Sequence, residues 1–396
     1  MAQVARDSYG RLLAVLAAPT RDIAAAEDAL ADALERALAR WPDDGIPVNP
    51  EGWLLTVARN RLRDLWKSSR YRMTDPLDEI DSISPSLEDD MPAIPDRRLE
   101  LMLVCAHPAV ASNIRTPLML QSVLGVDAAA IATAFAVEPS TMAQRLVRAK
   151  KRIHDAGIPF VLPERDDLAE RLPAVLEAVY GAYAIDWQLA PRGALIESLS
   201  AEALHLALGL AELLPDEPEV LGLAALVCLS EARRPARRTA DGGFIPLGEQ
   251  DTKLWDGVLI ARGEALLRRA YNHRRPARFQ YEAAIQSAHC TRATQGKVDL
   301  GALQRLHRAL LRVAPSLGAA VAAAAVDGEI DGPGAGLRAL DAISDPAVER
   351  FQPAWATRAH LLSDAGRVAE AADAYRRAIE LTADPGVAEY LFWRLR

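Results

Sequence analysis

A chain of 396 residues with a net charge of −8 has room for two or three domains, but it is too acidic to coat nucleic acid along its whole length. Half of its residues are hydrophobic and only 5% are aromatic, with long helical periodicities and almost no alternating strand pattern, so we predict an all-α protein. No apolar run reaches the length of a membrane span and the N-terminus lacks a signal-peptide core, so we expect a cytoplasmic protein without membrane contact. The three cysteines are far apart and fit no metal spacing, which predicts buried free thiols; we expect neither a metal nor a cofactor.

The first predicted domain, residues 1–73, contains an acidic helix at 23–40. Three acids share one side of this helix: Asp28, Asp32 and Glu35. Such a row is either a solvated face or a docking surface for a basic partner, and the charge pattern leaves both interpretations open. A loop follows at 42–50, PDDGIPVNP, which three prolines make rigid.

A long basic helix is expected from Glu51 to Arg72. Its basic residues recur at positions i, i+4, i+8 and i+11 and therefore form one ridge: Arg59, Arg63, Lys67 and Arg70. Asn60 lies on another face with Trp53, whose ring we expect in the core. A rigid loop beside a basic ridge is suited to holding a base outside the stack of the DNA.

Residues 74–96 are predicted to form a linker, because they contain eight acids, four prolines, no base and few apolar side chains to bury. A second small helical domain is predicted at 97–160. It ends in a helix, a turn of three or four residues, and a second helix that stops at the Gly157 break. Asp127 is expected to cap the first of these helices, with Ile131 and Phe135 facing inward. This pattern indicates a helix-turn-helix.

The second helix of the pair has a one-sided distribution of charge. Its apolar residues fall in one sector of the helix: Met142, Leu146, Ala149 and Ile153. In a helix-turn-helix the second helix lies in the major groove and its first turns reach base edges, which nominates Ser140, Thr141, Gln144 and Arg145 for the bases. Residues further along are better placed for phosphates: Arg148, Lys151 and Arg152.

The remainder, residues 164–396, is predicted to be a longer helical region with internal repeats. The segment 355–385 resembles the 34-residue tetratricopeptide pattern, in which small residues let paired helices cross. Weaker copies are expected at 202–229 and 303–326, and such pairs must stack to bury their faces. Two glycine-containing loops, 233–250 and 327–336, are expected to interrupt the array.

The ordered set of segments resembles a known family. The acidic helix, WLLTVARNRLRDLWK, the acidic linker and MAQRLVRAKKRI look like regions two and four of an extracytoplasmic-function sigma factor of bacterial RNA polymerase. Longer segments are similar to a subgroup with a tetratricopeptide-like C-terminal extension: RWPDDGIPVNPEGWLLTVARNR, LMLVCAHPAV, IATAFAVEPSTMAQRLVRAKKRIHDAGIPF, DGGFIPLGEQDTKLWD, GPGAGLRALD and AEAADAYRRAIELT. The resemblance implies two small helical sigma domains followed by a repeat domain.

The resemblance also implies partners and roles. The acidic helix with Asp28, Asp32 and Glu35 would dock to the clamp helices of the largest polymerase subunit. The 43–49 loop and the helix after it would melt and read the minus-ten element of promoter DNA, with these residues: Asn49, Arg59, Asn60, Arg63 and Lys67. Thr141, Gln144, Arg145 and Arg148 would read the minus-thirty-five element, and the linker would replace region three.

We therefore expect an alternative sigma factor, not an enzyme, whose C-terminal helices pack against the sigma domains and regulate them. A peptide or protein partner of the repeats is a further expectation. The alternative is a helix-turn-helix transcriptional regulator with a tetratricopeptide-like sensor domain, which would act on duplex DNA without polymerase. A carboxylate cluster at Asp166, Asp167 and Glu170 faintly resembles that of helical isoprenoid synthases, but a second cluster is not evident.

Overall fold

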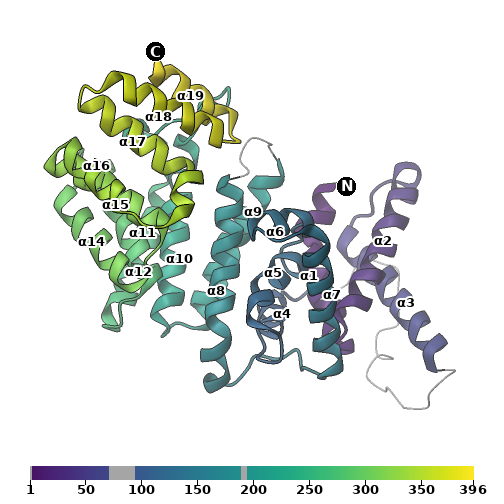
Figure 1. Cartoon of the computed structure of the whole chain (residues 1–396). Coiled ribbons are helices and arrows are strands. Elements are labelled where there is room, and N and C mark those ends of the chain that lie inside the picture. The colour runs from purple at the N-terminus through teal and green to yellow at the C-terminus, as the bar shows by residue number, and fades with distance from the viewer. Residues whose placement is uncertain (1, 71–93, 189–193) are drawn as a thin grey trace. The chain divides into compact units, whose positions relative to one another are not determined.

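The computed structural model describes residues 2–70, 94–188 and 194–396. Within them every regular element is a helix, which confirms the predicted all-α class. The chain divides into two compact units, Met1–Ile185 and Asp186–Arg396, whose helices are labelled in Figure 1. Most of the predicted linker lies outside the described residues. No helix in the described ranges is long and apolar enough to cross a bilayer.

The first unit is built from helices whose apolar side chains are buried, among them Leu13, Leu30 and Met119. Its described helices are α1 (Ala2–Thr20), α2 (Ile23–Asp44), α3 (Pro50–Arg70), α4 (Arg98–Cys105), α5 (Ser112–Ser122), α6 (Ala128–Ala134), α7 (Pro139–Asp155) and α8 (Arg165–Gln188). The unit ends at Ile185 and so includes most of α8, where Arg171 donates to the carbonyl oxygen of Leu103 in α4 at 3.4 Å. The first helix after the Gly157 break therefore packs with the helices that precede it.

The end of α2 corrects one expectation. A loop was predicted from residue 42, but the helix continues through Asp44. Trp41 is buried and its ring packs edge-on against that of Trp53, with centroids 5.4 Å apart, which holds the last turn of α2 against α3. The amide of Gly45, at a φ of 84°, donates to the carbonyl of Trp41 and ends the helix.

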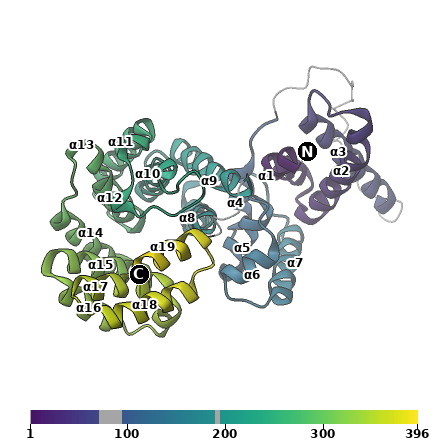
Figure 2. The same ribbon diagram turned by 90° about the horizontal axis from the view of Figure 1, so that it is seen from above.

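The second unit is a succession of helices that pack against their neighbours along the chain, which Figure 2 shows from above. Its α-helices are α9 (Ala194–Leu213), α10 (Pro218–Glu231), α11 (Gly257–Asn272), α12 (Arg278–Cys290), α13 (Arg292–Gln295), α14 (Leu300–Val313), α15 (Leu317–Asp331), α16 (Pro333–Asp341), α17 (Gln352–Asp364), α18 (Val368–Leu381) and α19 (Pro385–Leu395). In the segment 355–385, α17 and α18 pack through buried Ala359, Ala371 and Tyr375, and Gly366 turns the chain between them at a φ of 73°. The two alanines let the helices approach closely, and the ring of Tyr375 fills the space beside them.

The loop expected at 327–336 is not present. Residues to Asp331 belong to α15, those from Pro333 belong to α16, and Gly332 alone separates them at a φ of 86°. Two of its glycines, Gly328 and Gly336, serve close packing instead, because a β-carbon at Gly336 would lie 2.7 Å from the carbonyl oxygen of Ala324 and 3.0 Å from Cα of Gly328.

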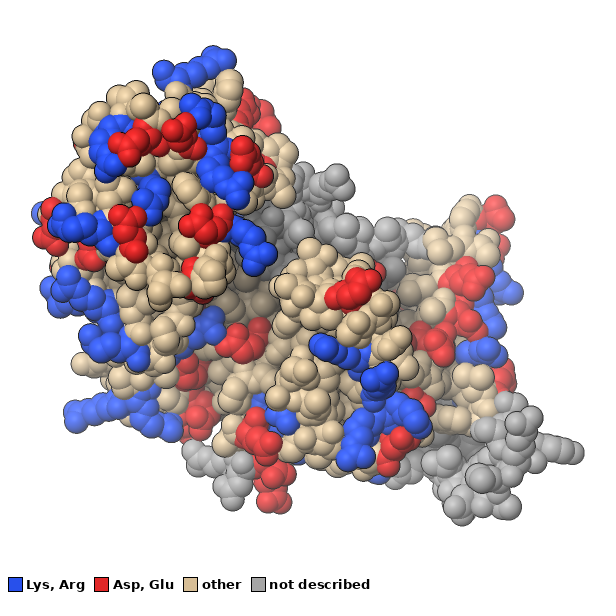
Figure 3. Space-filling view, in the orientation of Figure 1, with Lys and Arg blue, Asp and Glu red and all other residues tan. Residues whose placement is uncertain are grey.

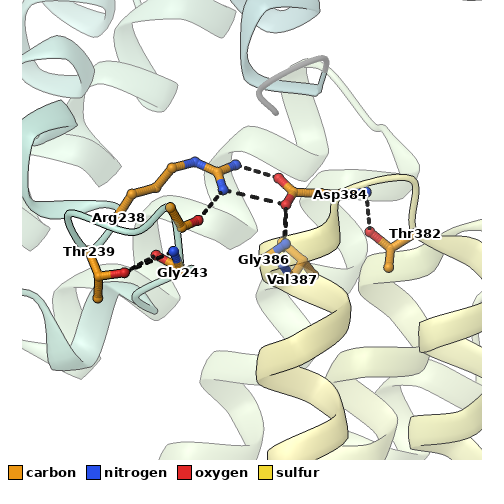
Figure 4. Close-up of polar contacts among 8 residues, drawn as sticks. Arg238, Thr239, Gly243, Thr382, Asp384, Gly386 and Val387 are labelled. Atoms are coloured by element: carbon orange, nitrogen blue, oxygen red, sulfur yellow. Dashed lines mark hydrogen bonds and ion pairs between the residues drawn. The ribbon is translucent and has the colours of Figure 1, made fainter. Parts of the chain in front are cut away.

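The 233–250 segment, expected to be a loop, contains two short 3-10 helices, Arg234–Ala236 and Leu247–Glu249, and the irregular chain between them reaches across to α19. Arg238 pairs with Asp384, the residue that caps α19, and also donates to the carbonyl of Gly242 at 2.9 Å (Figure 4). Phe244 packs edge-on against Tyr390 of α19, with ring centroids 5.6 Å apart. Segments about 150 positions apart in the sequence are thereby joined within the second unit.

All three cysteines are buried free thiols, which confirms that prediction. Burial raises the pKa of Cys105 and raises that of Cys228 to about 11, so both are protonated at neutral pH.

Candidate nucleic-acid interface

The candidate interface is centred on α6 and α7. Asp127 caps α6 as predicted, since its Oδ1 accepts from the amides of Ala129 at 2.8 Å and Ala130 at 3.3 Å. Four residues, 135–138, connect the helices, and Ala136 has a φ of 51°. Phe135 was expected to face inward, but its side chain is exposed. The expectation was wrong because α6 ends at Ala134 and the backbone turns away before the helical face continues.

Helix α7 separates its buried and charged faces. The four apolar residues predicted to be inside are all buried: Met142, Leu146, Ala149 and Ile153. The nominated polar residues lie along the rest of the surface, where Thr141 is half-buried and the others are exposed: Ser140, Gln144, Arg145, Arg148, Lys151 and Arg152. Figure 3 shows basic side chains gathered over α7. Lys151 contacts Asp155 one turn away, an exposed pair that leaves both side chains largely hydrated.

A hollow of about 310 Å³ adjoins the charged face of α7. Val110 and Ile114 contribute its apolar floor, and three arginines of α7 line it: Arg145, Arg148 and Arg152. The loop on the other side is held by Arg115, which donates to the carbonyls of Val110 at 2.9 Å and Pro108 at 3.3 Å. The three arginines therefore border a hollow that residues of α5 and of the loop before it also line.

Lys150 does not belong to the charged face. It is 7% exposed, and its Nζ lies 2.5 Å from Oε2 of Glu27 in α2. The sequence pattern contained a signal for this position, because eight residues after Met142 bring Lys150 to about 80° from it, at the edge of the apolar sector. The basic run of α7 thus has two roles, one toward solvent and one toward α2.

The basic ridge of α3 is only partly exposed. Arg59 is half-buried, and burial lowers its pKa. Arg63 donates to Oδ1 of Asn60 at 3.1 Å, while Asn60 and Lys67 are exposed; the side chain of Arg70 lies outside the described residues. The exposed part of this ridge can therefore contact the phosphates of DNA, whereas its half-buried part is less accessible.

The loop before α3 combines a capping residue with exposed apolar side chains. Oδ1 of Asn49 accepts from the amide of Gly52 at 2.9 Å, so Asn49 fixes the start of α3. Ile46 is 57% exposed and Val48 is 95% exposed. Sequence reasoning singled out the prolines of this loop and missed these two residues, which are the kind of side chain that wedges between bases.

The acids of α2 are not equivalent. Asp28 and Glu35 are exposed, whereas Oδ2 of Asp32 lies 2.6 Å from Nε of Arg61 in α3. Both members of this pair are more than a third exposed, so the contact stabilises the fold weakly and leaves Asp32 open to another partner. Among the described residues, no group of three or more metal-ligating side chains is gathered in one place.

Comparisons with known proteins identify two segments of the chain. Residues 5–72 match the sigma-70 region 2 model, and residues 171–271 match a family of unknown function, DUF6596. An uncharacterized protein of Rhizobium meliloti (strain 1021) is 35% identical over 386 residues, which cover 95% of this chain and 90% of that protein. No solved structure matches the chain.

The region 2 match covers α1, α2 and α3, the helices that carry the acidic face, the apolar loop and the basic ridge. The similarity to the Rhizobium protein extends through both units. The chain therefore belongs to the same family as this Rhizobium protein, and it carries a sigma-70 region 2 domain at its N-terminus.

Proposed function

We propose that the protein is an alternative sigma factor of the extracytoplasmic-function class that directs core RNA polymerase to specific promoters. One observation carries the proposal: a sigma-70 region 2 domain is followed, in the same compact unit, by a helix pair whose second helix buries its apolar face and exposes Arg145, Arg148 and Arg152. The match to sigma-70 region 2 supports promoter recognition in the way that sigma factors perform it. The basic face of α7 supports a second contact with DNA, as in a helix-turn-helix.

The division of labour follows from the chemistry of each surface. Exposed Ile46 and Val48 and the ridge of α3 would open and read the minus-ten element, with Asn60 and Arg63 at its centre. The first turns of α7 would read the minus-thirty-five element, and Arg152 would contact phosphate. Asp28, Asp32 and Glu35 would dock to basic residues of the polymerase clamp helices.

The second unit is proposed to be a tetratricopeptide-like regulatory domain. Helix pairs such as α17 and α18, with small buried residues where they cross, support this assignment.

Because the first unit extends to Ile185, a truncation that tests the regulatory role should end there. A cut after Val161 would remove the part of α8 that packs on α4 and α5.

Transcription in vitro tests the proposal. Purified core polymerase is combined with the full chain on genomic DNA, and start sites are mapped. The matched controls are core alone and the Arg145→Ala, Arg148→Ala, Arg152→Ala triple variant. We expect start sites that need the chain and are lost with the triple variant. If no new start sites are found and the chain binds duplex DNA by itself, the function is that of a polymerase-independent regulator.

A further inference from the structure

A buried ion pair joins the two halves of the first unit. Lys150 of α7 and Glu27 of α2 are 2.5 Å apart, with side chains 8% and 19% exposed. The buried hydroxyl of Ser122 in α5 donates to the other oxygen of Glu27 at 3.2 Å. Burial raises the pKa of the Cys105 thiol in α4, and the charges of Lys150 and Glu27 act on the same thiol. Helices from the region 2 half and from the α4–α7 half therefore meet at one polar node.

Contacts beside the node extend the same interface. Gly10 of α1 is pressed against the end of α5, because a β-carbon at this position would lie 1.8 Å from the carbonyl oxygen of Val123. Near the end of α7, Nδ1 of His154 lies 3.7 Å from Oδ2 of Asp22 in α2, and both side chains are partly exposed. The two halves are therefore packed as one body in this conformation.

The size of this body conflicts with the proposed task. A compact unit of residues 1–185 has a radius of gyration of about 16 Å and hence a diameter of roughly 40 Å. Elements named for positions minus 10 and minus 35 lie about 25 base pairs apart, or roughly 85 Å along B-form DNA. In the packed conformation α3 and α7 are too close together to read both elements at once. Residues 71–97 connect α3 to α4, and a chain of this length has a contour of up to roughly 90 Å, which does not by itself prevent separation.

We infer that the Glu27–Lys150 pair is a latch that holds the two DNA-reading halves in a closed, inactive arrangement and breaks when polymerase engages the protein. The inference rests on the proposed sigma function. The closed form leaves Asp28 and the arginines of α7 exposed for a first encounter with polymerase and DNA. It also keeps α3 and α7 too close together to read both promoter elements.

An ion pair is suited to reversible opening. When an apolar interface opens, the exposed apolar surface is hydrated, and the whole free energy of burying it is lost. When a buried ion pair opens, both charges regain their hydration, which offsets most of the attraction that is lost. Loss of a single partner has the opposite effect, because the remaining charge is buried without compensation in the closed form. Removing the Lys150 charge should therefore favour the open form.

A reversible cross-link tests whether opening is required. Asp22→Cys and His154→Cys place thiols at the partly exposed contact beside the latch, and a short cross-linker with a cleavable disulfide joins them. The native cysteines are buried, so they are poor targets for the reagent. The matched control is the same cross-link within α17, between His360→Cys and Asp364→Cys, which form an exposed i, i+4 pair.

We expect the cross-link between α2 and α7 to lower promoter transcription by at least tenfold, with recovery after reduction, and the control cross-link to leave it unchanged. Initiation by the cross-linked protein at the same sites and rate would overturn the latch alone. Failure of the unmodified chain to direct initiation would refute the proposed function and the latch with it.

A distance measurement tests the latch residue without transcription. Spin labels at exposed Ala39→Cys in α2 and Thr133→Cys in α6 should report one short distance in the free chain and an increase of roughly 40 Å with core polymerase. Lys150→Met should shift the free chain toward the long distance, whereas Lys151→Met, the same change at an exposed neighbour, should not. An unchanged distance in Lys150→Met, or on addition of core, would overturn the inference.

Discussion

Replacing Arg145 or Arg152 by alanine is expected to weaken promoter binding in two different ways. Both side chains are exposed on the same face of α7, but they are seven residues apart, which is about 10.5 Å along the helix axis. The major groove is about 12 Å wide. When the first turns of α7 lie in the groove, Arg145 is within reach of base edges and Arg152 is at the level of the phosphates.

The magnitudes follow from these positions. Arg145→Ala should cost about 1–3 kcal/mol at one base pair of the upstream element and relax the preference at that position. Arg152→Ala should weaken binding equally for every sequence, because a phosphate contact carries no base information. Loss of one phosphate contact lowers the salt slope by about 0.9 units, so between 50 and 200 mM salt the variant should lose roughly 3.5-fold less affinity than the parent.

The assay uses the complex of core polymerase and the full chain on a promoter mapped by transcription. Fluorescence anisotropy is measured with each upstream base pair substituted in turn and at several salt concentrations. Arg305→Ala, the same change at an exposed position of α14 in the second unit, is the matched control and should leave both quantities unchanged. Equal, sequence-independent losses for Arg145→Ala and Arg152→Ala would refute the assigned orientation of α7.

Three further predictions concern the acidic face, the helix packing and the pH dependence. Asp28→Lys with Asp32→Lys should abolish co-purification with core polymerase while circular dichroism stays unchanged, because like charges then face a basic partner; retained co-purification would leave α2 with only a solvated face. Gly336→Ala should destabilise the full chain in urea unfolding by about 1–3 kcal/mol. Gly334→Ala, whose β-carbon would meet only Nη1 of Arg338 at 3.5 Å, should change stability by less than about 0.5 kcal/mol. Burial lowers the pKa of His289 from 6.5 to about 4, so the folded state binds the proton less readily than the unfolded state. The contribution of neutral His289 to the free energy of unfolding is therefore fully present above pH 6.5 and is lost as the pH falls toward 4. Between pH 7 and pH 5 this loss is about 2 kcal/mol, and His289→Gln should remove it; the same pH dependence in the variant would show that other groups cause it.

Much of the candidate interface could be predicted because it depends on neighbours in the sequence. The cap at Asp127 involves amides two and three residues away. The buried face of α7, with Met142, Leu146 and Ile153, follows from the 3.6-residue period of a helix. These features are decided within one or two turns, so residue order alone specifies them.

Boundaries of elements were less predictable, because tertiary contacts compete with local propensity. The proline at position 42 favours a break, yet packing of Trp41 on Trp53 extends α2 for three more residues. The glycines at 328–336 indicate a loop, yet two of them, Gly328 and Gly336, allow α15 and α16 to approach each other more closely than a side chain would permit. In both cases the deciding contact is made with another helix.

The pairing of Lys150 with Glu27 was decided by tertiary structure alone. The two residues are 123 positions apart. The helical period places Lys150 at the edge of the apolar sector of α7, but it does not show which residue of another helix faces it. Its burial depends on α2 packing across α7, and no local pattern records which distant helix covers a given face. The sequence by itself determined the helices, their caps and the basic face of α7, because these arise from short-range geometry. Only the tertiary structure decided which charges face solvent and which are enclosed, because enclosure is a property of surfaces that meet from distant parts of the chain.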